Sequence, residues 1–269
     1  MAKRNVLITG AGSGLGLALA QRYAARGDAV ACVDIDGERA ESARASLPGD
    51  GHTAFTADVG NDASMTALRD AVLALVGVPD VLINNAGIAS GGSLLDSTMA
   101  EWREIFEINL LGVVRGCKAF LPGMLQRGSG SILNIASFAA LAGAPLIMTY
   151  GVAKGGVVTL SDQLRAELHG TPVTVAVACP AFFQTNLLQN WRGDERMKSQ
   201  AAKLMTRSSD TIDSVADNIF NAFERGDFLI LPTTGSAMNW RLRRWAPSLY
   251  FRQLMKLVAQ RSRAINSNS

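Results

Sequence analysis

Short apolar runs alternate with longer amphipathic stretches along most of the chain. Most of the runs are continuously apolar rather than alternating, and they cover residues 5–9, 29–34, 53–57, 80–84, 131–137, 173–179 and 228–231. Continuous apolar runs are typical of strands that are covered on both faces, as in a parallel sheet. We therefore predict a parallel sheet of about seven strands.

The stretches between these runs have helical periodicity, near residues 15–26, 38–46, 62–76, 99–127 and 151–169. Repeated alternation of strand and helix predicts an α/β fold, a doubly wound sheet with helices on both faces. The exception is 185–226, where two helical segments separate the last strands. An insertion beyond the carboxyl ends of strands is typical of a substrate loop or lid.

The C-terminal segment, 236–269, differs from the rest in charge. The chain has a net charge of +3, no acidic residue follows Asp227, and the segment carries seven basic residues: Arg241, Arg243, Arg244, Arg252, Lys256, Arg261 and Arg263. Pro247 suits a helix start. From there one face would carry Tyr250, Leu254, Leu257 and Val258, and another Arg252, Lys256 and Gln260.

Three interpretations of this basic amphipathic C-terminal extension stay open. The helix would dock on its own or a partner subunit, rest on an anionic membrane as a peripheral contact, or cover the mouth of a substrate site.

Composition narrows the class of protein further. The chain has 269 residues, of which 48% are hydrophobic, enough for one large domain. Three cysteines without CxxC spacing and two histidines argue against a disulfide framework or a metal site, and favour buried thiols in a reducing compartment. The N-terminus resembles a secretory signal, but glycines and serines interrupt its apolar run, and no run reaches the ~18 residues of a membrane span. We expect a cytoplasmic protein with no nucleic-acid partner.

The first motif with chemical meaning is TGAGSGLG, Thr9 to Gly16, directly after a predicted strand and before a predicted helix. Gly10, Gly14 and Gly16 have the spacing GxxxGxG. Glycines allow backbone to approach a pyrophosphate, and a helix N-terminus offers free amides and a positive dipole end. Taken alone, the motif also fits a tight turn without a ligand.

Polar residues follow the next strands at the same predicted sheet edge. Asp34 ends the second strand, where its carboxylate can accept hydrogen bonds from both adenosine ribose hydroxyls and repel a 2′-phosphate. No basic residue stands at Ser13 or Ile35, so NAD is favoured over NADP. The alternative is that Asp34 or Asp36 only caps the following helix.

Two further turns close strands on this edge: ADV at 57–59 and NNAG at 84–87. Asp58 would bind the adenine amino group, and Asn85, Ala86 and Gly87 would lie beside the ribose. Their joint placement, more than either turn alone, indicates a nucleotide site.

The fourth motif is TYGVAKGG, which places Tyr150 and Lys154 four residues apart and 13 residues beyond Ser137. On a helix, Tyr150 and Lys154 share one face. A nearby ammonium would lower the tyrosine pKa, so that the phenolate takes an alcohol proton as hydride leaves carbon. Ser137 would hold the substrate oxygen. An isolated YxxxK is more often a core tyrosine beside a snorkelling lysine.

With these motifs in this order, residues 4–186 resemble the classical branch of the short-chain dehydrogenase/reductase family. The resemblance implies a single Rossmann-type catalytic domain over 1–235, a nicotinamide cofactor (NAD, with NADP also open) and a Ser–Tyr–Lys catalytic set. It adds Asn109 as a fourth catalytic residue, bridged to Lys154 through water. Homodimers or homotetramers are the implied assembly.

The motifs and the resemblance together predict one set of cofactor-binding residues: Gly10, Ser13, Gly14, Leu15, Gly16, Asp34, Asp58, Val59, Asn85, Ala86, Gly87, Tyr150, Lys154, Pro180, Phe183 and Thr185. The chain departs from the family where Ala181 replaces the glycine that usually follows Pro180. Because alanine adopts positive φ only at a cost, the nicotinamide wall is expected to differ slightly there.

The residues expected around the substrate are mostly apolar, and no arginine stands near Tyr150 to bind a carboxylate. They are Phe138, Leu141, Pro145, Ile147, Met148, Phe182, Phe183, Leu187, Leu188 and Trp191. We therefore predict an NAD(P)-dependent oxidoreductase of a hydrophobic secondary alcohol or ketone. The alternatives are an NADPH-dependent carbonyl reductase of the 3-oxoacyl type and, from another class, a non-catalytic NAD-binding or membrane-associated scaffold.

Overall fold

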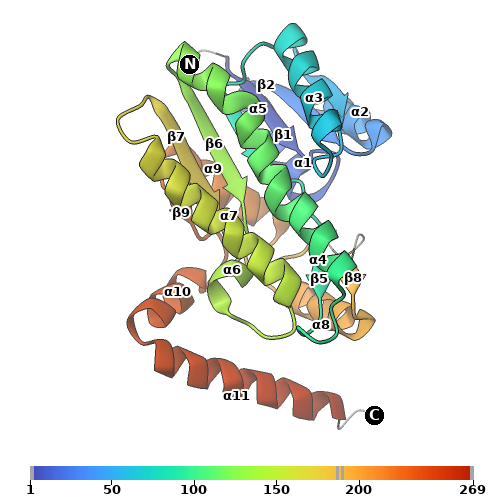
Figure 1. Cartoon of the computed structure of the whole chain (residues 1–269), viewed down its shortest axis with the longest axis vertical. Helices are drawn as coiled ribbons and strands as arrows, with labels where there is room; N and C mark the ends of the chain where they lie inside the picture. Colours follow the sequence, from blue (N-terminus) through green and yellow to red (C-terminus); the bar gives the residue numbers. More distant parts are fainter. Residues whose placement is uncertain (1–2, 186–187, 189–190, 267–269) are drawn as a thin grey trace.

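A parallel sheet of seven strands forms the centre of the computed structural model, which describes residues 3–185, 188 and 191–266 (Figure 1). The strand order is β3-β2-β1-β4-β6-β7-β9, and every pairing is parallel. The strands are β1 Asn5–Thr9, β2 Ala29–Asp34, β3 Thr53–Thr56, β4 Val81–Asn84, β6 Gly130–Ile135, β7 Val173–Ala178 and β9 Leu229–Ile230. They match the predicted runs, with ends shifted by one or two residues.

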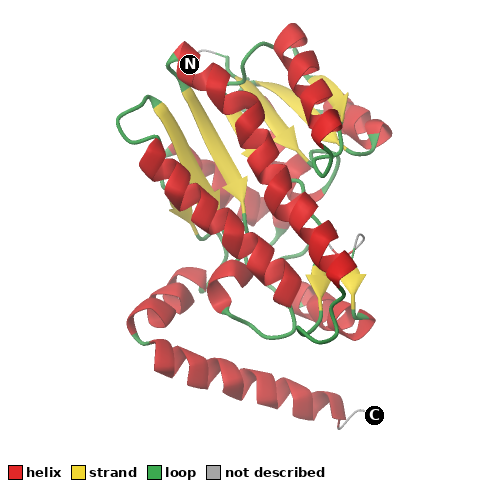
Figure 2. Cartoon of the chain, viewed as in Figure 1, coloured by secondary structure: helices red, strands yellow, loops and turns green. Residues whose placement is uncertain are grey.

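Helices cover both faces of this sheet, as predicted (Figure 2). One face packs against α1 Gly14–Ala25, α2 Gly37–Ser46 and α9 Ile212–Glu224, around buried side chains such as Tyr23 and Ile219. The other packs against α3 Asp62–Leu75, α5 Gly112–Arg127 and α7 Met148–Glu167, around Phe120 and Val157. The strands are therefore buried on both sides, which explains their continuous apolar sequences.

The predicted helix at 99–127 is one helical run with a change of winding inside it. It consists of α4 Met99–Phe106, the π-helical turn η1 Glu107–Leu111 and α5. By length and composition this run could cross a membrane, the one such helix among the described residues. Ile105, Phe120 and Met124 are fully buried inside the protein, however, so the run is a core helix.

Several short elements escape the sequence pattern. These are α6 Ala139–Ala142, α10 Ser236–Trp245 and a two-stranded ladder of β5 Ser90–Gly91 with β8 Arg192–Gly193. The ladder joins the predicted insertion to the loop after β4, and Arg192 also pairs with Glu104 of α4. The insertion contains two helices, as predicted, α8 Glu195–Thr206 and α9.

The last helix, α11 Pro247–Asn266, begins at the predicted proline. It runs along the lower edge of the molecule in Figure 1, beyond the carboxyl ends of the strands and away from the sheet. It makes no strand pairing and joins the body through α10, which packs on α6. Its place is therefore beside the end of the sheet where ligands bind in this architecture.

The strand order reverses between β1 and β4, which creates a crevice at the carboxyl ends of these strands. The loop after β1 packs closely against the start of α1 there. A Cβ atom on Gly16 would lie 2.1 Å from the Gly10 carbonyl oxygen, so only glycine fits. This close packing lets α1 begin directly at the crevice.

Candidate active site

A cavity of about 580 Å³ lies at the carboxyl ends of the strands and extends to α11. Its lining includes all the predicted cofactor and catalytic residues except Gly16 and Asn109. Gly16 instead packs beneath the loop that forms the cavity floor. Residues from several separate stretches of sequence thus meet at one place.

The glycine loop leaves the first amides of α1 unpaired by side chains. Ser13 is the N-cap residue, and its hydroxyl makes no capping hydrogen bond. The first backbone N–H groups of a helix have no partner within it and carry the positive end of the helix dipole. Together with Gly10 and Gly14, which line the cavity, they form a binding surface for a phosphate group.

Asp34 is buried at the end of β2, where three donors hold its carboxylate. The Gly12 N–H donates at 3.0 Å, the Asp36 N–H at 3.1 Å and the Arg39 guanidinium at 2.8 Å. Asp36, not Asp34, caps α2, since it accepts the N–H groups of Glu38 and Arg39. The capping alternative is therefore wrong for Asp34.

Arg39 is a residue that the sequence analysis missed. It lines the cavity and keeps about two fifths of its side chain exposed. It stands five residues after Asp34 in the first turn of α2, so the positions inspected for a basic residue, Ser13 and Ile35, did not include it. A cation is therefore present at the predicted adenosine end.

The NNAG turn is tied to the glycine loop by hydrogen bonds. The Asn85 side chain donates to the carbonyls of Thr9 and Gly10 at 2.9 and 3.2 Å, and the N–H groups of Asn85 and Ala86 donate to the Thr9 hydroxyl. The Asn85 amide thus fixes two loops against each other. Asp58 lines the cavity and accepts the Gly60 N–H at 2.8 Å.

This set of residues fits an extended dinucleotide. Glycines and free amides stand where a pyrophosphate would lie, a buried carboxylate stands at the adenosine end, and Lys154 lies at the other end of the same cavity. The residues that would hold the cofactor therefore form a continuous track.

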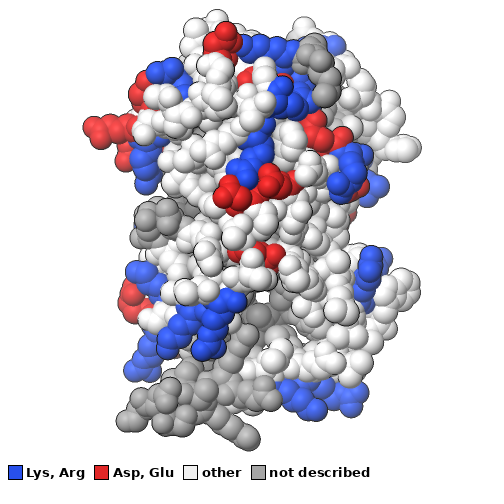
Figure 3. Space-filling model, turned by 180° about the vertical axis from the view of Figure 1, so that it is seen from behind, with Lys and Arg blue, Asp and Glu red and all other residues white. Residues whose placement is uncertain are grey.

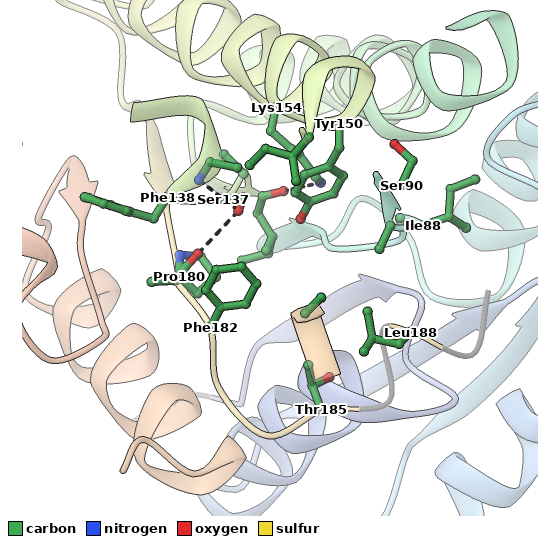
Figure 4. A pocket seen from close by; sticks show the side chains of 18 of the residues that line it. Ile88, Ser90, Ser137, Phe138, Tyr150, Lys154, Pro180, Phe182, Thr185 and Leu188 are labelled. Carbon is green, nitrogen blue, oxygen red and sulfur yellow. Dashed lines mark hydrogen bonds between the residues drawn. The ribbon is translucent and has the colours of Figure 1, made fainter. Parts of the chain in front are cut away.

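Ser137, Tyr150 and Lys154 converge on one wall of the cavity (Figure 4). Ser137 lies just beyond β6, and the other two lie one turn apart on α7. The Ser137 hydroxyl accepts the Ala139 N–H at 3.2 Å, and the Lys154 ammonium donates to the Ile135 carbonyl at 2.8 Å. Lys154 is only 3% exposed.

Burial controls the titration of this wall. It raises the pKa of Tyr150, against a smaller opposing effect of the hydrogen bond with Ser137. It lowers the pKa of Lys154 to about 8. Desolvation of the phenolate thus outweighs any lowering of the tyrosine pKa by Lys154, whose ammonium donates to the Ile135 carbonyl, and the expected lowering by Lys154 stays a prediction.

Asn109 is fully buried in η1, behind the cavity wall. Its side-chain oxygen accepts the Ile88 N–H at 2.9 Å, and its amide donates to the Ile88 carbonyl at 2.8 Å. A Cβ atom on Gly87 would lie 2.7 Å from the Asn109 oxygen and 3.4 Å from the Lys154 ammonium. Asn109 and Lys154 thus border the same glycine, and a water bridge between them stays a prediction.

Ala181 causes no backbone strain at the predicted nicotinamide wall. Among the described non-glycine residues the positive φ angle, 66°, belongs to Leu146. The Ala181 N–H donates to the Thr233 hydroxyl at 3.0 Å, and the Pro180 carbonyl accepts the Phe138 N–H at 2.8 Å. The missing glycine therefore leaves this turn well hydrogen-bonded.

The other half of the cavity is predominantly apolar. Of the residues expected there, the cavity is lined by Phe138, Pro145, Ile147, Phe182, Phe183, Leu188 and Trp191. Leu141 instead packs against the core and Met148 lies outside the lining, while Leu187 falls outside the described residues. The lining also includes Ser90, which sequence reasoning did not assign to it. It further includes residues of α8, in the predicted substrate loop, and of α11, for which a cover over the substrate mouth was one of three interpretations.

Comparisons with known proteins agree with this geometry. The family model "short chain dehydrogenase" matches residues 4–196. The chain is 34% identical over 224 residues to the 2-(R)-hydroxypropyl-CoM dehydrogenase of Xanthobacter autotrophicus, an alignment covering 80% of this chain and 89% of that one.

Two solved structures have the same fold over nearly the whole chain. A short-chain dehydrogenase/reductase from Burkholderia phymatum in complex with NAD aligns with a TM-score of 0.84 and 30% identity, covering 92% of this chain and 95% of that one. A short-chain dehydrogenase from Sphingobium yanoikuyae in complex with NADPH aligns with a TM-score of 0.77 and 27% identity, covering 94% and 95%.

Proposed function

We propose, since the chain belongs to the short-chain dehydrogenase family, that this NAD(P)-dependent oxidoreductase prefers NAD and acts on a neutral, hydrophobic secondary alcohol or its ketone. The observation that carries the proposal is the convergence of Ser137, Tyr150 and Lys154 on the cavity that Asp34 and the glycine loop also line. A cofactor and a reacting oxygen therefore have adjoining sites.

The side chains divide the proton chemistry between them. A bound nicotinamide supplies hydride acceptance from the alcohol carbon, or hydride donation to the ketone. Tyr150 takes the hydroxyl proton in oxidation and returns it in reduction. Ser137 holds the same oxygen by a hydrogen bond, and the buried Lys154 stabilises negative charge on the phenolate and binds cofactor hydroxyls. Asn109 positions the Gly87–Ile88 backbone that borders Lys154.

NAD is the preferred cofactor in this proposal because the Asp34 carboxylate occupies the place of an adenosine 2′-phosphate. Arg39, in contrast, favours the binding of NADP, since a guanidinium can bind a phosphate bidentately. The NADPH-dependent reductase therefore stays as the second candidate function, and its supporting observation is Arg39.

The assembly and the location are part of the proposal. Exposed apolar side chains on η1 and α7, such as Leu111 and Val152, support a homodimer or homotetramer. Sedimentation velocity measures the assembly state. Exposed Trp245 and Phe251 beside a cationic segment support peripheral contact with an anionic membrane. The buried thiols Cys32, Cys117 and Cys179 support a cytoplasmic, reducing location.

The test is a screen of secondary alcohols with NAD and NADP and of ketones with NADH and NADPH. Wild-type enzyme should turn over neutral hydrophobic substrates, and Tyr150→Phe should retain NADH binding but lose about a hundredfold or more in turnover. If Tyr150→Phe keeps full activity, Tyr150 is not the acid–base group. If wild type binds NADPH more tightly and Asp34→Ala does not change this, the NAD preference fails.

A further inference from the structure

We infer, building on the proposed function, that α11 forms the far wall of the substrate site and that the substrate is an elongated, uncharged apolar alcohol or ketone. Its reacting carbon would lie at Tyr150, and its other end would lie against one face of α11. This face, called here the pocket face, consists of Tyr250, Gln253, Leu254, Leu257 and Val258.

The pocket face lines the same cavity as the catalytic wall. Its members are spaced three or four residues apart, so they form one stripe along the helix. They line the cavity with Ser137, Tyr150 and Lys154, although about a hundred residues of sequence separate them. The stripe lines the cavity although Gln253 and Leu257 stay exposed, whereas Arg252 and Lys256 are exposed and do not line it.

Hydrogen bonds hold α10 and α11 in this place. The Tyr250 hydroxyl donates to the Ala142 carbonyl at 2.9 Å, and the Arg243 guanidinium contacts the Leu141 carbonyl. Both carbonyls belong to α6, between Ser137 and Tyr150 in the sequence. The far wall is thus attached to the segment that carries the catalytic groups.

The apolar surface of this half of the cavity is incompletely buried. Leu257 is 51% exposed and Phe182 40% exposed, although both line the cavity. Apolar side chains left open in this way gain about 25 cal/mol per Å² when a ligand covers them. An apolar chain lying between Phe182 and Leu257 would cover both.

Leu146 is a further exposed apolar residue of the cavity, and its backbone conformation is unusual. It lines the cavity at 38% exposure and has a φ of 66°, a left-handed conformation that is unfavourable for a residue with a side chain. Its carbonyl accepts the Gly92 N–H at 2.9 Å, but its side chain stays exposed. Contact with an apolar substrate would give the side chain a partner.

Charge and polarity limit the substrate further. Among the described residues, the charged groups that line the cavity are Asp34, Arg39 and Asp58 at the adenosine end and Lys154 at the catalytic wall. At the α11 end the described polar groups of the lining are uncharged, the amides of Asn239 and Gln253 and the Tyr250 hydroxyl. A carboxylate or sulfonate there would meet no cation among the described lining residues, whereas a hydroxyl or carbonyl would find a hydrogen-bond partner.

The test compares two leucines of α11. Leu257 lies on the pocket face, whereas Leu249 is similarly exposed at 41% and does not line the cavity. We measure kcat/KM with NAD for the series from 2-butanol to 2-dodecanol. For wild type it should rise about threefold to fourfold per added methylene until the chain fills the site.

Leu257→Gln should lower kcat/KM for 2-undecanol about tenfold and change 2-butanol less than about twofold, while Leu249→Gln changes neither. Leu254→Trp, which fills the site, should move the optimum to a shorter alcohol. Equal effects of Leu257→Gln and Leu249→Gln, or equal effects on both alcohols, overturn the inference. Preferred turnover of anionic 2-hydroxypropyl-CoM overturns it as well.

Calorimetric titration of 2-undecanone into the same variants separates this inference from the proposed function. Binding that weakens in Leu257→Gln, without turnover of any alcohol by wild type, would refute the proposed function and support the far wall. Turnover of short alcohols that none of the α11 substitutions changes would support the proposed function and refute the far wall. Circular dichroism of each variant checks that the fold is retained.

Discussion

At the scale of single residues, the burial of Lys154 lowers the free energy of unfolding of the protein. Its pKa of about 8, below the usual lysine value of 10.5, means that the folded protein binds fewer protons than the unfolded chain between these two values. Stability therefore rises with pH across about 8 to 10.5 from this group, and the full cost is present below pH 8. The shift corresponds to about 3 kcal/mol.

Lys154→Met removes this cost. We expect the variant to be about 2 kcal/mol more stable than wild type at pH 7, since the unpaired Ile135 carbonyl takes back about 1 kcal/mol. It should also lose the rise in stability above pH 8 and most of the activity. Urea unfolding at several pH values measures the first two effects. Exposed Lys118→Met is the control, and a destabilised Lys154→Met with an unchanged pH slope contradicts the assignment.

Arg39 and Asp34 form a second testable pair. Asp34→Ala should release Arg39 for a 2′-phosphate and shift the ratio of NADPH to NADH affinity about tenfold or more toward NADPH, because the repelling carboxylate is gone. Asp34→Ala with Arg39→Ala should lack this gain. Fluorescence titration with the two reduced cofactors gives the ratio. Equal ratios in the two variants would show that Arg39 does not meet the phosphate.

At the scale of elements, a hydrogen bond from the Tyr250 hydroxyl to the Ala142 carbonyl joins α11 directly to α6. Tyr250→Phe removes the hydrogen bond to Ala142, worth about 1 kcal/mol, which corresponds to about fivefold more frequent opening of α11. Hydrogen exchange of the first turns of α11 should become faster by that factor, while the exchange of β4 stays unchanged. Ser248→Ala, on the exposed side, is the control. Equal exchange in the two variants would mean that other contacts hold the helix.

Sequence periodicity predicted the long elements well because burial on both sheet faces leaves continuous apolar runs. It missed β5, β8 and α6, which are too short to show a period, and the π-helical turn at Glu107–Leu111, whose residues continue the pattern of the flanking helices. The division of the chain at residue 235 stays a prediction.

The sequence predicted those candidate site residues whose spacing is set by their chemistry, such as Gly10, Asp34, Ser137 and Tyr150. It did not predict features that depend on contacts between residues distant in the sequence. Arg39 reaches Asp34 through the first turn of α2, and the desolvation that raises the Tyr150 pKa comes from side chains distant in sequence. The stripe on α11 was visible in the sequence, but only packing showed which surface it faces.

At the scale of the whole molecule, charge is unevenly distributed. On the side drawn in Figure 3, acidic and basic side chains are interspersed over the upper part, while Lys and Arg predominate among the charged side chains of the lower part. Trp245, 81% exposed, ends α10, which also carries Arg241, Arg243 and Arg244, the last of them stacked on Trp240. A basic surface with exposed aromatic residues is suited to the headgroup region of an anionic bilayer.

We therefore expect wild type to sediment with vesicles containing phosphatidylserine and not with neutral phosphatidylcholine vesicles, less strongly as salt is raised. Arg252→Glu with Lys256→Glu should weaken this binding without changing NADH affinity, because both residues lie outside the cavity. Charge reversal of Glu41 to Lys, on α2 at the far end of the molecule, is the control. Binding that ignores lipid charge and both substitutions would refute the membrane contact.

Because α11 lies outside the sheet, the part of the protein that would contact the substrate can change independently of the part that would bind the cofactor. The groups predicted to bind the cofactor and to transfer the proton all precede residue 186, whereas the proposed far wall belongs to α11, which adds no strand to the sheet. A ribosome completes the reactive centre before it completes the surface that selects the substrate. In evolution, replacing that last stretch would exchange one alcohol for another while the folding core and the catalytic residues stay intact.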